Sequence, residues 1–312
     1  MKLSKYRFVI KPQQQLILSP YKGSALRGIF GLGLRNLLCP DIRRKCNECM
    51  AQNMCVYSYV FETSILSEIR GQKKKIDAPR PFIIEPPLDQ INYYGMDDRL
   101  AFNFILIGRA VDYIKICIKA FQERGNMGIG TNNGKYFLEK VTCINKDIEK
   151  IIFDGNSYRD DCQIIESSEL LNEGAKLNLN RVTLRFLTRA RMKYEGDPVT
   201  DLYFEIFMVN LLGRLESIAR IHCDEKWEFD KIGLIKRSKE IRTIHNNLKW
   251  KDLKRRSNRQ NIEMEKGGLL GEITFEGELA EFMPFIKLGE FLHIGGGTAY
   301  GLGKYEIMGE EE

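Results

Sequence analysis

The chain has 312 residues, of which 43% are hydrophobic and 29% are charged, and its formal net charge is +6. This composition is typical of a soluble globular protein, and the length predicts two domains that each bury a core of their own. We find no apolar run of transmembrane length and no charged-then-apolar leader, so we expect no membrane partner and a cytoplasmic location. The positive charge favours a polyanionic partner.

In the first half of the chain, the hydrophobic pattern changes between strand and helix periods. Residues 5–10 alternate polar and apolar side chains, as a half-buried strand does. Residues 24–38 place apolar side chains at helical spacing, with Ser24 as the expected N-cap. Three glycines inside this helix indicate a close approach to another backbone. The further elements expected here are strands at 56–61, 81–84, 100–107 and 136–141 and a helix at 109–124.

The second half repeats a similar order of elements. We expect strands at 177–187, 269–275 and 305–308, an extended segment at 227–234, and helices at 201–223 and 279–288. Strand–helix–strand units that recur twice predict an α+β fold of two domains, each an antiparallel sheet with helices on one face. The predicted domains are residues 1–153 and 177–312, joined by a polar linker at 154–176.

Eight cysteines are present, but no secretory signal accompanies them, which argues against a disulfide framework. Four of them gather among polar, turn-prone residues as C-x6-C-x2-C-x5-C, namely Cys39, Cys46, Cys49 and Cys55. Four thiolates suit structural zinc in a closed tetrahedral site; an iron–sulfur cluster and four unconnected thiols are the alternatives. We therefore predict a zinc-binding insertion at about residues 39–59 that is architectural and not catalytic. The other four, Cys117, Cys143, Cys162 and Cys223, are scattered and are predicted to be buried or incidental thiols.

A glycine-rich segment near the end of the chain is the most informative motif. Between His293 and Tyr305 it holds Gly295, Gly296, Gly297, Gly301 and Gly303, and it ends next to Lys304. Glycines packed this densely allow close backbone approach to a ligand, and successive N–H groups can accept an anion. The segment fits neither the GxxxxGK[ST] nor the GxGxxG nucleotide-binding pattern. Contact with a phosphate or RNA backbone and a bulged turn are the two interpretations.

Two basic clusters favour a nucleic-acid partner. Six cations lie between Lys249 and Arg259, with Asp252 as the one acid among them. Arg189, Arg191 and Lys193 alternate, which on a strand would put all three side chains on one face. A charge run is most often a solvated face, but two such runs together with a glycine loop predict nucleic-acid binding.

Several blocks of sequence together resemble one family. They are residues 21–31, the four-cysteine insertion followed by 57–61, then 80–82, 85–87, 255–260 leading to 267–271, and the terminal glycine loop. By the order of these blocks, the chain is similar to the CRISPR precursor-RNA processing endoribonucleases of the RAMP superfamily. It resembles the cysteine-containing branch of that family. The resemblance implies two tandem ferredoxin-like (RRM-like) domains, a glycine-rich loop that contacts CRISPR repeat RNA, and CRISPR effector complex proteins as further candidate partners.

The resemblance also implies metal-independent cleavage with no catalytic metal. In this reaction the ribose 2′-OH attacks the adjacent phosphate and leaves a 2′,3′-cyclic phosphate and a 5′-OH. The protein must orient the 2′-OH, assist its deprotonation, stabilise the charge on the phosphorus and protonate the leaving oxygen. Histidine suits the proton transfers because its pKa lies near neutrality, whereas lysine and arginine suit the charge stabilisation.

The candidate catalytic residues follow from where such side chains occur. Many relatives place a histidine on or near the first helix, but this chain has none before His222, which is expected to be structural. His293 precedes the glycine loop and His245 lies beside a basic cluster, so both are candidates. A site without histidine would use Tyr21, Lys22 and Arg27 at the first helix. The residues expected to contact RNA are Arg27, Arg189, Arg191, Arg256, Arg259, Lys304 and the five loop glycines.

Two other functions compete with RNA cleavage. A non-catalytic RAMP subunit that binds guide RNA in an effector complex would share the fold and the glycine loop, and the missing N-terminal histidine favours it. An unrelated zinc-stabilised RNA-binding module is the third hypothesis.

Overall fold

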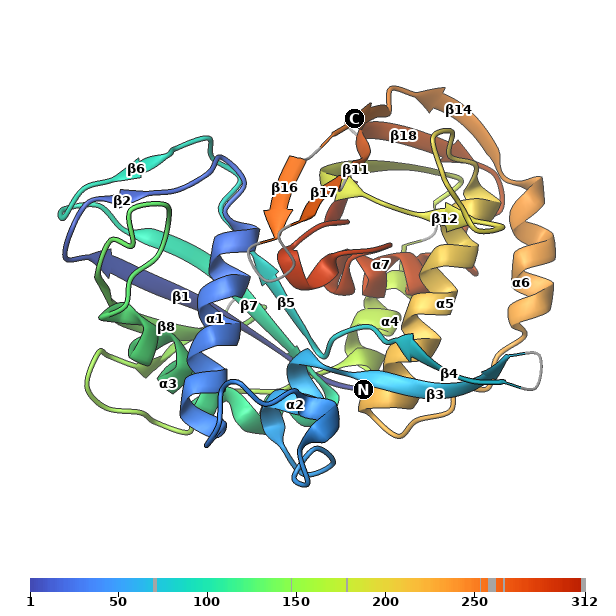
Figure 1. Cartoon of the computed structure of the whole chain (residues 1–312). Helices are drawn as coiled ribbons and strands as arrows, with labels where there is room; N and C mark the ends of the chain where they lie inside the picture. Colours follow the sequence, from blue (N-terminus) through green and yellow to red (C-terminus); the bar gives the residue numbers. More distant parts are fainter. Residues whose placement is uncertain are drawn as a thin grey trace. The chain divides into compact units, whose positions relative to one another are not determined.

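The computed structural model describes residues 1–69, 72–146, 148–177, 179–252, 254–257, 262–265 and 267–309 (Figure 1). They form two compact units: residues 1–165 with 220–224, and residues 166–219 with 225–312. The stretch 154–176, which we expected to be a linker, contains strand β10 (Ile165–Glu166) and helix α4 (Ser167–Ala175). No helix among the described residues is long and apolar enough to cross a membrane.

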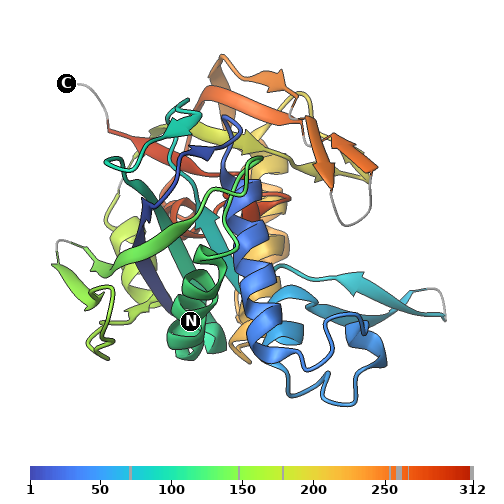
Figure 2. The ribbon, with the colours of Figure 1, turned by 60° about the vertical axis from the view of Figure 1, so that its left-hand side comes forward.

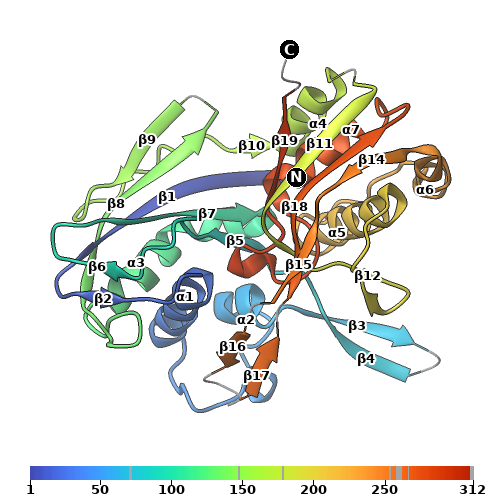
Figure 3. The same ribbon diagram turned by 90° about the horizontal axis from the view of Figure 1, so that it is seen from above.

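The first unit is built on an antiparallel sheet with strand order β5-β7-β1-β8-β9. Helices α1 and α3 pack on the same side of this sheet (Figures 1 and 3). The strands of the sheet are β1 (Lys2–Pro12), β5 (Phe82–Glu85), β7 (Leu100–Ile107), β8 (Tyr136–Asn145) and β9 (Ile148–Phe153). The helices are α1 (Gly23–Leu38), η1 (Cys46–Glu48), α2 (Val56–Phe61), η2 (Gly108–Tyr113) and α3 (Ile114–Gly125). β3 (Ser64–Ile69) and β4 (Gln72–Asp77) form a hairpin, and the short strands β2 (Leu16–Ile17) and β6 (Tyr93–Tyr94) form a separate antiparallel pair.

Phenylalanine rings hold this unit together. Phe30 of α1 lies 4.9 Å from Phe104 of β7 and 5.3 Å from Phe121 of α3, measured between ring centroids. Phe8 of β1 lies 5.0 Å from Phe121. Large buried aromatic rings supply both area and packing geometry, so these contacts fix the two helices on the sheet. A side chain at Gly33 would collide with the Ala120 backbone of α3, which explains a glycine within α1.

The second unit repeats the topology of the first. Its sheet has the order β14-β18-β11-β19, with every pairing antiparallel, and Phe204 and Phe207 of α5 pack on Phe275 of β18. The strands are β11 (Arg181–Ala190), β14 (Arg242–Asn246), β18 (Gly268–Glu276) and β19 (Tyr305–Met308), with β15 (Lys249–Lys251) pairing β18. The helices after α4 are α5 (Phe204–His222), α6 (Lys231–Arg237), η3 (Ser238–Glu240), α7 (Met283–Leu292) and η4 (Thr298–Tyr300). Two hairpins pair β12 (Lys193–Tyr194) with β13 (Asp197–Pro198) and β16 (Lys254–Ser257) with β17 (Ile262–Glu265).

Both sheets therefore follow the β-α-β-β-α-β order of a ferredoxin-like domain. In each, the first strand of the motif sits between the third and the fourth, and the second strand lies beyond the third. The predicted α+β class with two tandem ferredoxin-like domains is confirmed.

Four local expectations were wrong. Residues 56–61 form helix α2 instead of a strand, because Phe61 packs on Phe30 and this tertiary contact overrides the β preference of the aromatic residues. Residues 231–237 form helix α6, whose N-cap Asp230 accepts from the Gly233 N–H at 2.8 Å. Helix α1 begins one residue before Ser24, after Lys22, whose side chain makes no cap bond. Cys143 and Cys162, expected to be incidental thiols, form a disulfide.

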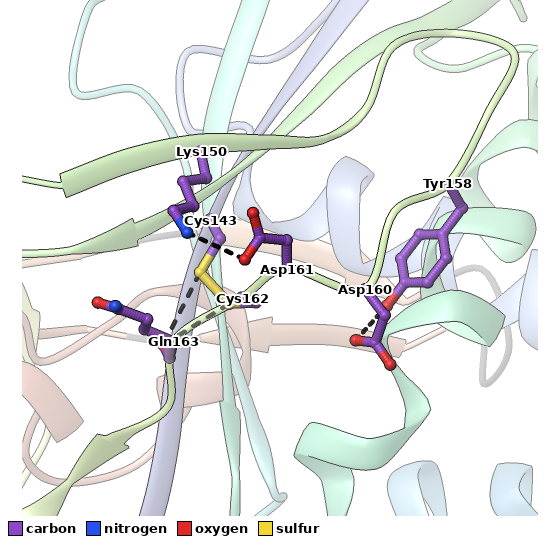
Figure 4. Close-up of a disulfide and its surroundings, with 7 residues drawn as sticks. All are labelled: Cys143, Lys150, Tyr158, Asp160, Asp161, Cys162 and Gln163. Carbon is purple, nitrogen blue, oxygen red and sulfur yellow. Dashed lines mark hydrogen bonds and ion pairs between the residues drawn. A yellow bond between two sulfur atoms is a disulfide. The ribbon is translucent and has the colours of Figure 1, made fainter.

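This disulfide joins strand β8 to the chain that follows β9 (Figure 4). The Cα atoms of Cys143 and Cys162 are 5.6 Å apart and the two residues are separated by 19 positions. Beside it, Lys150 Nζ lies 2.9 Å from Asp161 Oδ1. The spacing was no guide to this pairing, because the two cysteines meet only through the turn between β8 and β9.

Candidate functional site

The glycine-rich loop connects α7 to β19 in the second unit and is largely closed by its own hydrogen bonds. The Ile294 N–H donates to Gly303 O at 2.9 Å, and the Gly303 N–H donates to Arg189 O at 3.0 Å. The Gly296 N–H donates to Arg191 O at 2.8 Å. None of these bonds uses the N–H of Gly295 or Gly297, which are half-buried on either side of the exposed Gly296. The accessible part of the loop is therefore residues 295–297, while Gly301 and Gly303 are buried.

Positive φ angles explain why glycines stand in this loop. The φ angle is +74° at Gly295, +81° at Gly297, +82° at Gly301 and +72° at Gly303, in the left-handed region that L side chains rarely adopt. A Cβ at Gly295 would also collide with the Arg191 carbonyl, against which the loop packs. The glycines thus serve the turn itself and the close approach to the chain after β11.

An open pocket of about 330 Å³ lies beside Gly295 and Gly296. It is lined by Gly295, Gly296, Arg191, Lys193, Asn210 and Arg214, all within the second unit. Three of these six residues carry a positive charge and none carries a negative charge. The pocket can therefore attract an anion, and the two glycines allow a ligand close to the backbone.

Strand alternation brings the cations of this pocket to one side. Arg189 and Arg191 are half-buried and Lys193 is exposed, whereas the residues between them, Ala190 and Met192, are fully buried. This is the single-face arrangement that alternate spacing predicts. Asn210 of α5 fixes the backbone of Lys193, because its Nδ2 donates to Lys193 O at 3.0 Å and its Oδ1 accepts from the Lys193 N–H at 3.3 Å.

Arg214 links the pocket to the end of helix α7. Its Nη2 donates to Leu292 O at 2.9 Å and its Nε to His293 O at 3.1 Å, so it satisfies two carbonyls at the helix C-terminus. Burial lowers the pKa of Arg214 to about 10, which leaves the guanidinium protonated at neutral pH. Sequence reasoning missed Arg214 and Asn210. A signal was present, since these two polar residues stand four apart, on one face of the helix, within the otherwise apolar stretch 206–215.

The candidate catalytic histidine of the loop is buried. His293 has no exposed surface, and its Nδ1 lies 3.1 Å from Leu302 O. His222 is also fully buried, with Nδ1 3.1 Å from Tyr59 Oη and Nε2 2.7 Å from Pro79 O in the first unit. His245, on β14, is exposed. All three histidines of the sequence lie within the described residues, and among them only His245 presents its side chain to solvent.

The candidates at the first helix are held by packing. Lys22 is fully buried, and its Nζ contacts Asp89 Oδ1 at 2.7 Å and donates to Asp89 O at 2.9 Å. Bonds from Lys22 and from the Ile91 N–H lower the pKa of Asp89, although burial alone would raise that pKa. Tyr21 is half-buried, and the guanidinium carbon of Arg27 lies 5.0 Å from the Phe61 ring centroid.

The remaining predicted RNA contacts lie elsewhere. Lys304 is half-buried directly before β19, and its N–H donates to Thr188 Oγ1 at 2.8 Å. Arg256 is on β16, and Arg259 lies outside the described residues. The structure thus brings Arg191, Gly295 and Gly296 together in one pocket and places Lys22 and His293 in the interior.

The four clustered cysteines lie on the segment between α1 and α2. None of them forms a disulfide, and all four are half-buried. Burial, and then the nearby Cys55, raises the pKa of the Cys39 thiol. Within the parts of the chain that the structure covers, no three His, Cys, Asp or Glu side chains lie close enough together to hold a metal ion.

Comparisons with known proteins place the chain in a family. Residues 1–167 match the N-terminal domain of the AF_1859 family, and residues 184–305 match the family described as CRISPR-associated endoribonuclease Cas6. The chain belongs to the AF_1859 family by its N-terminal domain, and its second half is similar to the Cas6 family. An uncharacterized protein of Archaeoglobus fulgidus is 22% identical over 309 residues, which is 94% of this chain and 93% of that protein.

Solved structures of Cas6 proteins share this fold. A product complex of Thermus thermophilus Cas6 matches with a TM-score of 0.59 at 13% identity and covers 98% of this chain and 99% of its own. A partial Cas6-RT-Cas1–Cas2 complex matches with a TM-score of 0.60 at 13% identity; the match spans 100% of this chain and 46% of that one. At this identity the likeness concerns the fold.

Proposed function

We propose that this protein is a CRISPR repeat RNA endoribonuclease that cleaves precursor RNA by metal-independent attack of a ribose 2′-OH. Homology to the Cas6 family supports the endoribonuclease class. The observation that carries the proposal is the pocket where Arg191, Lys193 and Arg214 meet Gly295 and Gly296. A site with three cations and an accessible glycine backbone fits a ribose-phosphate strand.

In this proposal the pocket holds the RNA backbone and stabilises charge. Arg191 and Lys193 face the phosphate from the chain after β11, and Arg214 keeps its charge while it fixes the loop. As negative charge grows on the phosphoryl oxygens, these cations stabilise the transition state more than the ground state. Electrostatic stabilisation and in-line orientation then supply most of the rate, and the products are a 2′,3′-cyclic phosphate and a 5′-OH.

We choose the candidate residues for proton transfer by the solvent exposure of their side chains. His293 and Lys22 are fully buried, so in this arrangement they position backbone and do not meet substrate. His245 is exposed and is therefore the candidate general acid or base, with Tyr21 as the candidate for orienting the nucleophile. Single-turnover rates of His245→Ala, Tyr21→Phe, His293→Ala and Lys22→Met test this assignment. The first two variants are expected to slow cleavage without weakening RNA binding.

The reaction is tested with purified protein and repeat RNA in the presence of EDTA. We expect cleavage to continue, and we expect a single 2′-deoxy substitution at the cleavage site to abolish it. End-group analysis should show the cyclic phosphate. Cleavage that stops in EDTA and returns with added Mg²⁺, or that survives the 2′-deoxy substitution, would contradict the proposed mechanism.

A second candidate is a non-catalytic RAMP subunit that binds guide RNA beside CRISPR effector proteins. The burial of His293 and Lys22 favours it, because two of the four candidate catalytic side chains are sealed in the interior. It predicts tight binding and ordered assembly along the RNA with no cut in any buffer. Detection of a specific cut in the repeat by the isolated protein would reject this candidate.

A further inference from the structure

In the segment between α1 and α2, residues 39–55, the cysteines are less exposed than nearly all other residues. Within it only Cys39, Cys46, Cys49, Cys55 and Gln52 are half-buried, and every other residue is exposed. Even its large apolar side chains face solvent, with Met50 98% and Met54 88% exposed. A hydrophobic core would show the opposite pattern, with the methionines inside. The four cysteines, with Gln52, are thus the least exposed residues of a segment that has no apolar core.

Local backbone geometry places these thiols at fixed points. Cys39 is the C-cap of α1 and Cys55 is the N-cap of α2. Cys46 and Cys49 flank the short helix η1, whose turn is closed by the Cys49 N–H donating to Cys46 O at 3.2 Å. Figure 2 shows this segment as a loop that projects from the end of α1. Two ligands from one turn and one from each helix end is an arrangement that can surround a single ion.

Neither disulfide bonding nor regular backbone hydrogen bonding accounts for the lower exposure of the cysteines. None of the four is in a disulfide, although the same chain forms one between Cys143 and Cys162. Apart from short turns such as Gln52 N–H to Cys49 O at 3.0 Å, the segment has little regular hydrogen bonding to hold it together. The sulfur atoms are not yet within ligation distance of a common point. Little packing opposes their approach, so a metal can draw them together.

We propose that Cys39, Cys46, Cys49 and Cys55 bind one zinc ion as four thiolates. Zinc suits this donor set because it takes four sulfur ligands tetrahedrally, and four protein ligands leave no position for substrate. Such a site carries a net charge of about −2, and the cations Arg43, Arg44 and Lys45 outnumber the acids Asp41 and Glu48 of the segment. Arg35 of α1 also reaches it, since its Nη2 donates to Arg44 O at 2.8 Å.

The bound ion would act on the fold of the first unit. It would tie the C-terminal end of α1 to the start of α2, whose Phe61 packs on Phe30 in the core. Binding free energy of a structural zinc is available as folding free energy, because the separated thiols of the unfolded chain do not form the site. Removal of the metal should therefore loosen the segment and α2 without changing the residues of the glycine-loop pocket.

The test measures metal in the full-length protein, produced with zinc in the medium and purified without chelator. We expect about one zinc per chain by elemental analysis. Exchange of the native protein with Co²⁺ should produce thiolate-to-cobalt charge-transfer absorption and the visible bands of a tetrahedral site. This second readout needs no variant, so it stands even where a cysteine substitution prevents folding.

The variant Cys46→Ser/Cys49→Ser should lose the metal, whereas Cys223→Ser, which changes another half-buried cysteine outside the segment, should keep it. Metal content near zero after zinc titration would overturn the proposal, as would full zinc content in the double variant. Iron with acid-labile sulfide would replace zinc by a cluster and would overturn it as well.

Discussion

His293 occupies a backbone conformation that ordinarily belongs to glycine. Its φ and ψ angles are 60° and 172°, a region that a residue with a Cβ enters at a cost of about 1–3 kcal/mol. Arg214 donates to its carbonyl and to that of Leu292, and Nδ1 of His293 lies 3.1 Å from Leu302 O. The contacts on both sides of the residue hold the strained backbone, and they set the direction in which the glycine loop leaves α7.

This conformation yields a prediction that separates backbone from side chain. His293→Gly and His293→Ala both lose the imidazole, but only the glycine relieves the strain. We expect the free energy of unfolding of His293→Gly, measured by chemical denaturation, to exceed that of His293→Ala by about 1–3 kcal/mol. The alanine variant should also bind repeat RNA more weakly, because its loop is less well held.

The same pair tests the role of the imidazole. If His293 positions the loop, the glycine variant retains more cleavage than the alanine variant. Equal and near-complete loss of single-turnover cleavage in two folded variants would show instead that the imidazole transfers a proton.

At the scale of elements, Lys22 ties the start of α1 to the chain before β6. Its Nζ is buried against Asp89 and also donates to Pro20 O at 3.3 Å. Lys22→Met removes a buried ammonium, but its acceptors on Asp89 and Pro20 lie near solvent and can be hydrated, so we expect a loss of only about 1 kcal/mol in the free energy of unfolding near pH 7. Thermal and urea denaturation measure it.

The loss should depend on pH with a definite sign. Despite its partial burial, Asp89 has a lowered pKa in the folded protein because of the bonds from Lys22 and the Ile91 N–H. Its contribution is therefore present above the unfolded pKa of about 4 and disappears as the pH falls through the lower folded pKa. The difference between wild type and Lys22→Met should therefore shrink as the pH falls below the unfolded pKa of Asp89. A constant difference, or the same shrinkage in a background of Asp89→Asn, would contradict this origin.

The disulfide is a second link between elements, and a reducing agent can break it. Cross-linking Cys143 to Cys162 restricts the unfolded chain, so Cys143→Ser/Cys162→Ser should lose about 2–4 kcal/mol of stability in oxidising buffer. In excess reductant, wild type and variant should unfold at the same denaturant concentration. A gap that persists after full reduction would assign the loss to packing at Cys143, which is 3% exposed.

The elements that the sequence predicted best are those whose own residues decide their state. The strands at 100–107 and 305–308 have the predicted bounds. The first of them is a long and mainly apolar run, which carries a clear pattern in the sequence alone. The helix at 56–61 is six residues long and rich in aromatic residues, so no helical period could appear in it. Its conformation depends on Phe30, which lies far away in the sequence.

The site was predictable in part for the same physical reason. Alternate spacing indicated the face of Arg189, Arg191 and Lys193, and glycine density indicated the loop. The sequence could not show that Gly301 and Gly303 are buried, or that Arg214 comes from α5 to complete the pocket, because these facts depend on contacts between distant segments.

At the scale of the whole molecule, a net charge of +6 favours any polyanion, so charge alone does not locate a binding site. The salt dependence of binding can locate the site, because the loss of each phosphate contact makes the plot of log K against log salt concentration less steep. Lys193 is exposed at the pocket, and Lys193→Gln removes one such contact without touching the core. With repeat RNA, the slope of log K against log salt should be smaller in magnitude for this variant than for the wild type by about 0.7–0.9.

Lys231→Gln is the matched control, because it removes the same charge from α6, where Nζ already pairs with Glu216 at 2.5 Å. Both variants lower the net charge by one, so a long-range effect of charge would weaken their binding equally. A local contact changes the slope only for Lys193. If both variants shift the slope alike, RNA is held by the diffuse field of the molecule and the pocket beside the glycine loop is not its binding site.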